Sequence, residues 1–421
     1  MTYCNHFRSR FEMSYDSVVV IIMVVSLFVL QSGLARTMGP SNYAPIDSHH
    51  DTIDEARLGK SSTVLPPAGP EGVLYDNASG DVYVADHGNI SVIDTATNAV
   101  TASIELSNLS PEGMALDDIT GNLYVAEWGA NSVAVISTST NKVVDTVRVG
   151  GYPESVAYDP DNGDLYTTNC NTNNVSVIYG SSNVVVETIP VGVCPMAIAY
   201  DNGNDAIYVA NELSWNVSVI SGATNEVVDT IQIAYWSGHT FILSSNAMAY
   251  DPANGFVYLV NTEFNNVSVI NGTSNSIISS MLMSLPPEGI VCDGENNRVY
   301  VSVDFHDYNA VMVFNAKNWL SIAEVPVGLI PEGMAYDRVT GDIYVVNAGT
   351  DNVSVISGNT VTVVATVSLV SSSLEAAGFL GLPGSQGYYV LGIGAAAGGI
   401  VVAVWVRALL PQPKKNHPPG T

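Results

Sequence analysis

The sequence predicts an all-β protein, a seven-bladed β-propeller of four-stranded blades, with an N-terminal signal peptide and a C-terminal transmembrane helix. Three observations carry this prediction. A tyrosine recurs at spacings of 41 to 50 residues, and each repeat contains four short runs rich in β-branched residues. No repeat contains an amphipathic helical pattern, which argues against helical repeats and βαβ units. Two apolar segments outside the repeats account for the two ends of the chain.

The repeat is anchored by a tyrosine that valine follows in most copies. Its seven copies are Tyr83, Tyr124, Tyr166, Tyr208, Tyr258, Tyr300 and Tyr344. Their usual separation of about 42 residues is typical of four-stranded propeller blades. In the last copy the runs PEGMAYD, GDIYVVN, NVSVIS and VTVVATVSL are bounded by Gly, Asn, Asp or Pro, which favour turns. Each repeat is therefore expected to form one four-stranded blade.

These repeats resemble a known family. The segments YVANELSWNVSVIS (residues 208–221) and YVVNAGTDNVSVIS (residues 344–357) are similar to the YVTN β-propeller repeats of archaeal and bacterial surface proteins. The resemblance covers residues 70–369 and implies a surface-layer-type propeller, often exported or membrane anchored, without a defined active site. The chain departs from the usual pattern by carrying glutamate after the proline at most blade entrances.

The N-terminal residues 1–35 are predicted to be a signal peptide. Arg8 and Arg10 precede an apolar run at residues 18–30, and small residues follow it. The alternative is an uncleaved signal anchor. Residues 36–69 are then a linker, in which residues 61–65 are a candidate outer strand that closes the ring.

The C-terminal segment 388–406 is predicted to be a transmembrane helix. It contains no charged residue, and as a helix it would be about 28 Å long, enough to cross a bilayer. Arg407, Lys414 and Lys415 follow it, which places the tail 407–421 in the cytoplasm and the propeller outside the cell. Residues 370–387 would be a stalk. The expected location is the cell membrane, with a single span.

The charge balance restricts the partners. The chain has 13 Lys and Arg against 40 Asp and Glu, and a formal net charge of −27. This argues against nucleic acid, because binding to phosphates needs basic side chains. The expected partners are cell-envelope proteins, glycans or peptides, and the membrane through the C-terminal helix.

A glutamate at the entrance of five repeats predicts an acidic ring around the central channel. Its members are Glu71, Glu112, Glu154, Glu288 and Glu332. Such carboxylates could bind calcium, another divalent cation or a cationic ligand. The alternative is that each glutamate accepts hydrogen bonds from backbone amides of the adjoining blade.

Three histidines fall in loops on the same face of the predicted propeller. His87, His239 and His306 are candidates for a metal or acid–base site, because imidazole binds transition metals and titrates near neutral pH. The alternative is that they are separate, solvated loop residues.

An insertion before the fifth repeat, AYWSGHTFILSSN (residues 234–246), places several aromatic side chains on one loop. Tyr235, Trp236 and Phe241 are candidate ligand-binding residues, since aromatic loop residues on a rigid scaffold favour recognition. The alternative is a flap that packs these rings over the channel or a neighbouring blade.

The cysteines and sequons give two further expectations. Cys170 ends a second strand and Cys194 enters the next blade on the same face, so an exported protein could form a Cys170–Cys194 disulfide. Asn-x-Ser/Thr occurs eight times, but five copies belong to the recurring NVS or NIS, where turn chemistry explains the asparagine. Glycosylation is expected best at Asn108 and Asn271, which lie outside that repeat position.

These observations support two functions from different classes. The first is a membrane-anchored extracellular propeller that acts as a binding or cell-envelope, surface-layer-like interaction module. The alternative is a divalent-metal-dependent lyase or hydrolase that uses the Glu- and His-rich face. No catalytic residue is assigned. A c-type haem protein is excluded because the chain has no CxxCH.

Overall fold

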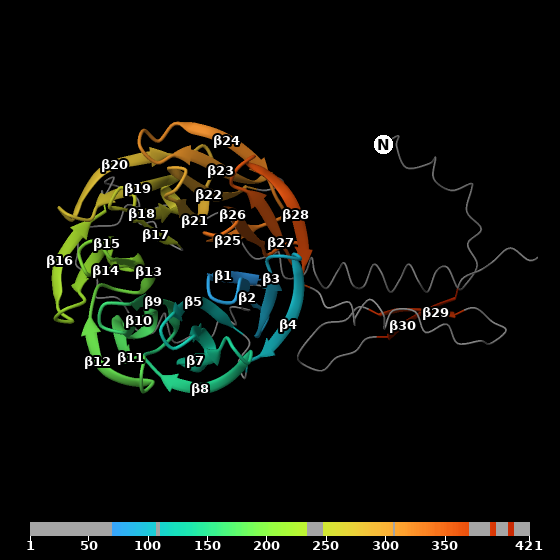
Figure 1. Cartoon of the computed structure of the whole chain (residues 1–421), viewed down its shortest axis with the longest axis horizontal. Coiled ribbons are helices and arrows are strands. Elements are labelled where there is room, and N and C mark those ends of the chain that lie inside the picture. The colour runs from blue at the N-terminus through green and yellow to red at the C-terminus, as the bar shows by residue number, and fades with distance from the viewer. Residues whose placement is uncertain are drawn as a thin grey trace, which may run out of the picture. The chain divides into compact units, whose positions relative to one another are not determined.

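The computed structural model describes residues 70–106, 110–233, 247–305 and 308–369, together with two short strands at 388–392 and 403–407. All of them belong to the second of two units, residues 65–421. Seven four-stranded antiparallel sheets surround a central axis, which confirms the predicted seven-bladed propeller (Figure 1). The first strand of each blade lies nearest the axis and the fourth lies outermost.

The blades follow one another along the chain without strand exchange among the described residues. Blades 1 and 2 comprise β1 (Pro70–Asp76), β2 (Asp81–Asp86), β3 (Asn89–Asp94), β4 (Ala99–Glu105), β5 (Pro111–Asp117), β6 (Asn122–Glu127), β7 (Ser132–Ser137) and β8 (Lys142–Arg148). Blades 3 and 4 comprise β9 (Pro153–Asp159), β10 (Asp164–Asn169), β11 (Asn174–Tyr179), β12 (Val184–Pro190), β13 (Pro195–Asp201), β14 (Ala206–Asn211), β15 (Asn216–Ser221) and β16 (Val227–Gln232). Blade 5 comprises β17 (Met248–Asp251), β18 (Phe256–Asn261), β19 (Asn266–Asn271) and β20 (Ser276–Leu282). Blades 6 and 7 comprise β21 (Pro287–Asp293), β22 (Arg298–Phe305), β23 (Tyr308–Asn315), β24 (Ser321–Pro326), β25 (Pro331–Tyr336), β26 (Asp342–Asn347), β27 (Asn352–Ser357) and β28 (Thr362–Ser368).

The repeated tyrosine is buried in the second strand of every blade and contacts the next blade. The Tyr124 hydroxyl donates to Asn183 Oδ1 at 2.7 Å, and the Tyr208 hydroxyl donates to Asn275 Oδ1 at 2.6 Å. The acceptor asparagines lie in the turns between third and fourth strands and have positive φ angles, which asparagine tolerates better than most residues. The sequence period is therefore also the period of the contacts between blades.

Blade 7 closes the ring directly on blade 1. Val82 and Val84 of β2 share a buried cluster with Tyr344 and Val346 of β26. The Tyr344 hydroxyl also donates to Asn98 Oδ1, at 3.2 Å. The predicted closing strand at residues 61–65 lies outside the described residues, as does the predicted signal peptide.

The recurring NVS asparagine has a structural role in four blades. In blade 3, Asn169 Nδ2 donates to Asn174 Oδ1 at 2.9 Å and to Ser176 Oγ at 3.0 Å. The same pair of contacts recurs at Asn211, Asn261 and Asn347. Internal hydrogen bonding therefore gives these asparagines a structural role within each blade.

The C-terminal segment differs from the expectation. Strands β29 (Tyr388–Gly392) and β30 (Ala403–Arg407) pair antiparallel where a transmembrane helix was predicted at 388–406. No helix within the described parts of the chain is long and apolar enough to cross a membrane. The two ends of the segment are rich in Val, Tyr and Trp, which favour strands, whereas a spanning helix depends on the hydrocarbon around it.

Candidate functional site

The two faces of the propeller carry different loops, because strand direction alternates within each blade. We call the face with the loops into the first strands and between the second and third strands the entrance face. The opposite face, with the other turns of each blade, is the hairpin face. On the entrance face the two kinds of loop are joined by backbone hydrogen bonds, such as Cys170 N to Tyr152 O at 3.0 Å and Ala348 N to Ile330 O at 2.8 Å.

All five predicted glutamates occupy the second position of a first strand and are half-buried on the entrance face. We call Glu71, Glu112, Glu154, Glu288 and Glu332 the Glu ring. Blade 4 has Met196 at this position, and the described first strand of blade 5 begins later, at Met248. The charges of this ring interact across several blades. After burial, which is the main cause, the charges of Glu71, Glu154 and Glu332 raise the pKa of Glu112.

Glycine lets the inner strands of adjacent blades approach closely at four of the five glutamates. In the PEG sequence, a glycine follows the glutamate and faces the next blade, whereas Ser155 follows Glu154. A Cβ atom on Gly289 would lie 2.1 Å from the Glu332 carbonyl oxygen, and one on Gly333 would lie 2.4 Å from the Glu71 carbonyl oxygen. Only glycine allows adjacent inner strands to approach so closely.

We therefore expect Gly289→Ala to destabilise the propeller. The added methyl group overlaps a backbone carbonyl, and the strain of such overpacking typically costs about 1–3 kcal/mol. A calorimetric melting curve measures the loss. Gly129→Ala is the matched control, because a Cβ at Gly129 meets nothing within 4 Å. Equal melting temperatures for the two variants would contradict the close-approach argument.

Burial keeps several ring carboxyls protonated near neutral pH. Burial first, with the charges of Glu212 and Glu71 adding to it, raises the pKa of Glu154 to about 7, although a hydrogen bond from Trp128 opposes the rise. Burial and the charges of Glu288, Glu71 and Asp304 raise the pKa of Glu332 to about 8. Burial also raises the pKa of Glu112, which shares a hydrogen bond with Glu71. The Glu ring therefore carries less negative charge than five free carboxylates.

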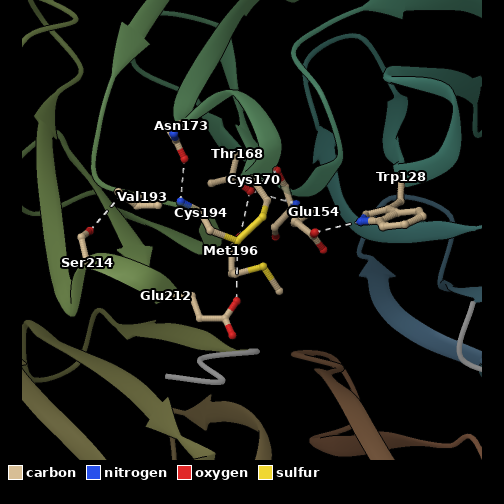
Figure 2. Close-up of a disulfide and its surroundings, with 11 residues drawn as sticks. Trp128, Glu154, Thr168, Cys170, Asn173, Val193, Cys194, Met196, Glu212 and Ser214 are labelled. Carbon is tan, nitrogen blue, oxygen red and sulfur yellow. Dashed lines mark hydrogen bonds between the residues drawn. A yellow bond between two sulfur atoms is a disulfide. The ribbon is translucent and has the colours of Figure 1, made fainter. Parts of the chain in front are cut away.

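A stacked aromatic pair lies beside Glu154. Trp128 begins the short 3-10 helix η1 (Trp128–Ala130), and its ring stacks on Tyr152 with centroids 4.4 Å apart. The Trp128 indole N–H donates to Glu154 Oε1 at 3.0 Å (Figure 2). Tyr152 is 40% exposed. This pair was not among the predicted site residues, although a Trp and a Tyr in facing loops of adjacent blades were a usable signal.

Cys170 and Cys194 form a disulfide next to this pair, with an S–S distance of 2.04 Å (Figure 2). The disulfide joins the second-to-third-strand loop of blade 3 to the loop that enters blade 4. The Cys194 amide donates to Asn173 Oδ1 at 2.9 Å, and Glu212 Oε2 lies 3.6 Å from Cys194 Sγ. Burial, with a contribution from the charge of Glu263, raises the pKa of Glu212 to about 7. The disulfide thus fixes two loops that lie between the carboxyl groups of Glu154 and Glu212, whose pKa values are both raised to about 7.

The structure describes one of the three predicted site histidines. His87 Nδ1 contacts Asp86 Oδ1, and its side chain is 43% exposed on the entrance face. His239 and His306 lie outside the described residues, as do the predicted ligand-binding residues Tyr235, Trp236 and Phe241. The shared histidine site and the aromatic insertion therefore stay predictions.

The fold and this face define a class: a seven-bladed propeller whose entrance face combines buried carboxyls, a stacked aromatic pair and a disulfide. The model of the Choice-of-anchor I domain family matches residues 112–330, more than half of the chain. The chain belongs to the Choice-of-anchor I domain family. This membership suggests a propeller associated with the cell surface.

No curated protein sequence matches the chain. Among solved structures, the hydrazine synthase of Kuenenia stuttgartiensis is similar, with a TM-score of 0.60 and 17% sequence identity. The similarity covers 75% of this chain and 99% of that chain. At such low identity the likeness shows the propeller fold alone, since propellers carry unrelated functions.

Proposed function

We propose that this protein is an extracellular, surface-layer-type propeller that binds a cationic ligand on its entrance face. The family match supports a surface location. The apolar composition of residues 388–406 before Arg407 supports membrane anchoring by this segment, although its two ends pair as strands β29 and β30 in the structure. The disulfide supports an exported location, because disulfides persist in oxidising compartments.

The observation that carries the binding proposal is the arrangement of Trp128, Tyr152 and Glu154. The exposed part of an aromatic pair attracts a protonated amine through its π-face, and neighbouring carboxylates add an ionic contact. The backbone bonds and the disulfide hold the surrounding loops in place, so little ordering entropy is lost on binding. The ligand class is therefore a protonated amine, as found in amino sugars of glycans and in lysine side chains of peptides.

We expect Trp128→Ala or Tyr152→Ala to weaken binding of such a ligand by about 30-fold, the loss of about 2 kcal/mol typical of an aromatic hot spot. Isothermal titration calorimetry with a glucosamine oligomer and, separately, with a lysine-containing peptide distinguishes the two sources of amine. Tyr179→Ala is the matched control, since Tyr179 is 45% exposed but lies on the hairpin face.

Proton release gives the same titration a second readout. A bound cation lowers the raised pKa values of Glu154 and Glu332, so binding at pH 7 should release protons. Titrations in buffers of different ionisation enthalpy measure this release. Binding without proton release, or equal losses in the Tyr179→Ala control, would contradict the entrance-face site.

A divalent-metal-dependent lyase or hydrolase is the second candidate function. The pKa values of Glu154 and Glu212, both raised to about 7, favour it, because a general acid or base works best near the operating pH. Calcium or another divalent cation would then bind among the carboxylates of the entrance face. Catalytic turnover of a bound substrate, rather than stoichiometric binding, distinguishes this function from the first.

A further inference from the structure

The hairpin face carries a second group of carboxylates, built on a buried aspartate that recurs in every blade. Each first strand is followed by a tight turn, and the aspartate at its start is at most 2% exposed. In five blades the second carboxylate oxygen accepts a side-chain hydrogen bond from the residue three positions later. These pairs are Asp117 with Thr120, Asp201 with Asn204, Asp251 with Asn254, Asp293 with Asn296 and Asp337 with Thr340.

Blade 3 departs from this pattern. Asp159 Oδ1 accepts the Asp161 amide at 2.9 Å, as expected for the turn. The side-chain amide of Asn162 instead donates to the Tyr166 hydroxyl at 3.2 Å and to Gly222 O at 3.0 Å. Asp159 Oδ2 is therefore left without a hydrogen-bond partner, although Asp159 is 0% exposed. A buried carboxylate oxygen in this state is costly unless another group binds it.

Two more carboxylates lie close to that of Asp159. Asp161 lies in the same turn, and Asp205 comes from the turn between β13 and β14 of blade 4. One ligand atom from each of the three aspartates lies within 4.8 Å of the others. The Tyr200 hydroxyl is 3.2 Å from Asp161 Oδ2 and 3.4 Å from Asp205 Oδ1, but one hydroxyl proton cannot balance three carboxylates. No lysine or arginine in the described part of the chain forms an ion pair with them.

We propose that Asp159, Asp161 and Asp205 bind a calcium ion that links blades 3 and 4 on the hairpin face. Three oxygens at most 4.8 Å apart have a common point within about 2.8 Å of each, so shifts of a few tenths of an ångström bring all three to the calcium–oxygen distance of about 2.4 Å. An all-oxygen donor set selects hard cations over transition metals, and two turns from different blades suit the flexible coordination of calcium better than the strict octahedron of magnesium.

The neighbouring backbone leaves room for the carboxylates. A Cβ atom on Gly222 would lie 2.2 Å from Asp205 Oδ1 and 2.5 Å from Asp159 Oδ2, so glycine is needed beside the group. Three carboxylates this close repel one another, and a divalent cation would relieve that repulsion. This site lies on the face opposite to the Glu ring and is independent of the proposed function.

Terbium luminescence on the full-length protein tests the proposal. Terbium occupies calcium sites and emits strongly when a nearby tyrosine, here Tyr200, transfers energy to it. We expect a luminescent complex that calcium displaces. Asp161→Asn and Asp205→Asn should each weaken terbium binding by about tenfold or more, since loss of even an outer-shell partner commonly costs 10–100-fold.

Three further variants complete the design. Asn162→Thr introduces the threonine that blades 2 and 7 have at this position. Its hydroxyl can donate to Asp159 Oδ2, as Thr120 and Thr340 do to their own aspartates, so this variant should also weaken terbium binding. Asp118→Asn removes an exposed carboxylate from the equivalent turn of blade 2, and Glu332→Gln removes one from the Glu ring. Both should leave terbium binding unchanged.

The calcium site would be overturned by wild-type protein that binds terbium no more tightly than Asp161→Asn, or by a loss in Asp118→Asn as large as in Asp205→Asn. Circular dichroism of each variant without cation confirms that the propeller is folded. A loss confined to Glu332→Gln would place the cation at the Glu ring instead.

Discussion

Replacing Cys170 and Cys194 together with serine should lower the free energy of unfolding by about 3 kcal/mol. The disulfide closes a loop with a sequence separation of 24 residues, and loops of this size restrict the unfolded chain by about that amount. Denaturant titration of the oxidised wild type and of the double variant measures the difference. The same substitution should weaken amine binding, because it releases the loops beside Glu154 and Glu212.

Two controls separate the crosslink from the substitution itself. A reductant added to the wild type should reproduce most of the loss without any change in sequence. Cys292→Ser removes the free thiol of β21 but keeps the disulfide, so this variant should lose as much stability in reductant as the wild type does. If the oxidised wild type and the double variant unfold at the same denaturant concentration, the disulfide contributes nothing to the native state.

The fold could be predicted because the repeated residues make the contacts between blades. Each repeated tyrosine predicts a second strand. The hydroxyls of Tyr124, Tyr208 and Tyr344 each donate a hydrogen bond to a turn asparagine of the next blade. The positions of the Glu ring follow from the same register, since each glutamate is the second residue of a first strand. The repeat spacing of the sequence was therefore enough to predict the positions of both the blades and the Glu ring.

The features that do not repeat could not be predicted in this way. The Trp128–Tyr152 stack joins two loops that differ from their equivalents in other blades, so no periodicity marks it. The Asp159 group depends on a single change in hydrogen bonding at Asn162, whose counterparts Asn204 and Asn254 bond to their own aspartates. The segment 388–406 is apolar whatever its conformation, and composition does not distinguish a helix in lipid from paired strands.

The stability of the propeller should fall as pH rises from about 5 to about 8. In the unfolded chain a glutamate titrates near pH 4.3, whereas in the fold the pKa of Glu154 is raised to about 7 and that of Glu332 to about 8. Between these values the folded state holds protons that the unfolded state has lost. By linkage, the free energy of unfolding therefore decreases with pH over this window, and the pKa of Glu112, raised by burial to about 11, extends the decrease above it.

The expected effect is large because each unit of pKa difference corresponds to about 1.4 kcal/mol. A shift such as that of Glu154 thus sets an upper limit of about 3 kcal/mol between the two ends of the window. Melting temperatures measured at intervals of pH from 5 to 9 follow the change. The experiment is best done at constant ionic strength, since salt screens the repulsion among the ring carboxylates.

Neutral substitutions assign the pH dependence to the Glu ring. Glu154→Gln and Glu332→Gln should each flatten the profile and raise the melting temperature at pH 8, because glutamine keeps the shape but cannot acquire the buried charge. Glu187→Gln, on the exposed outer strand β12, is the matched control and should leave the slope unchanged. If the ring glutamates instead served as acceptors for backbone amides, the glutamine variants would lose stability at every pH and keep the wild-type slope. A profile that rises between pH 5 and 8 would show that protonation of the Glu ring does not stabilise the fold.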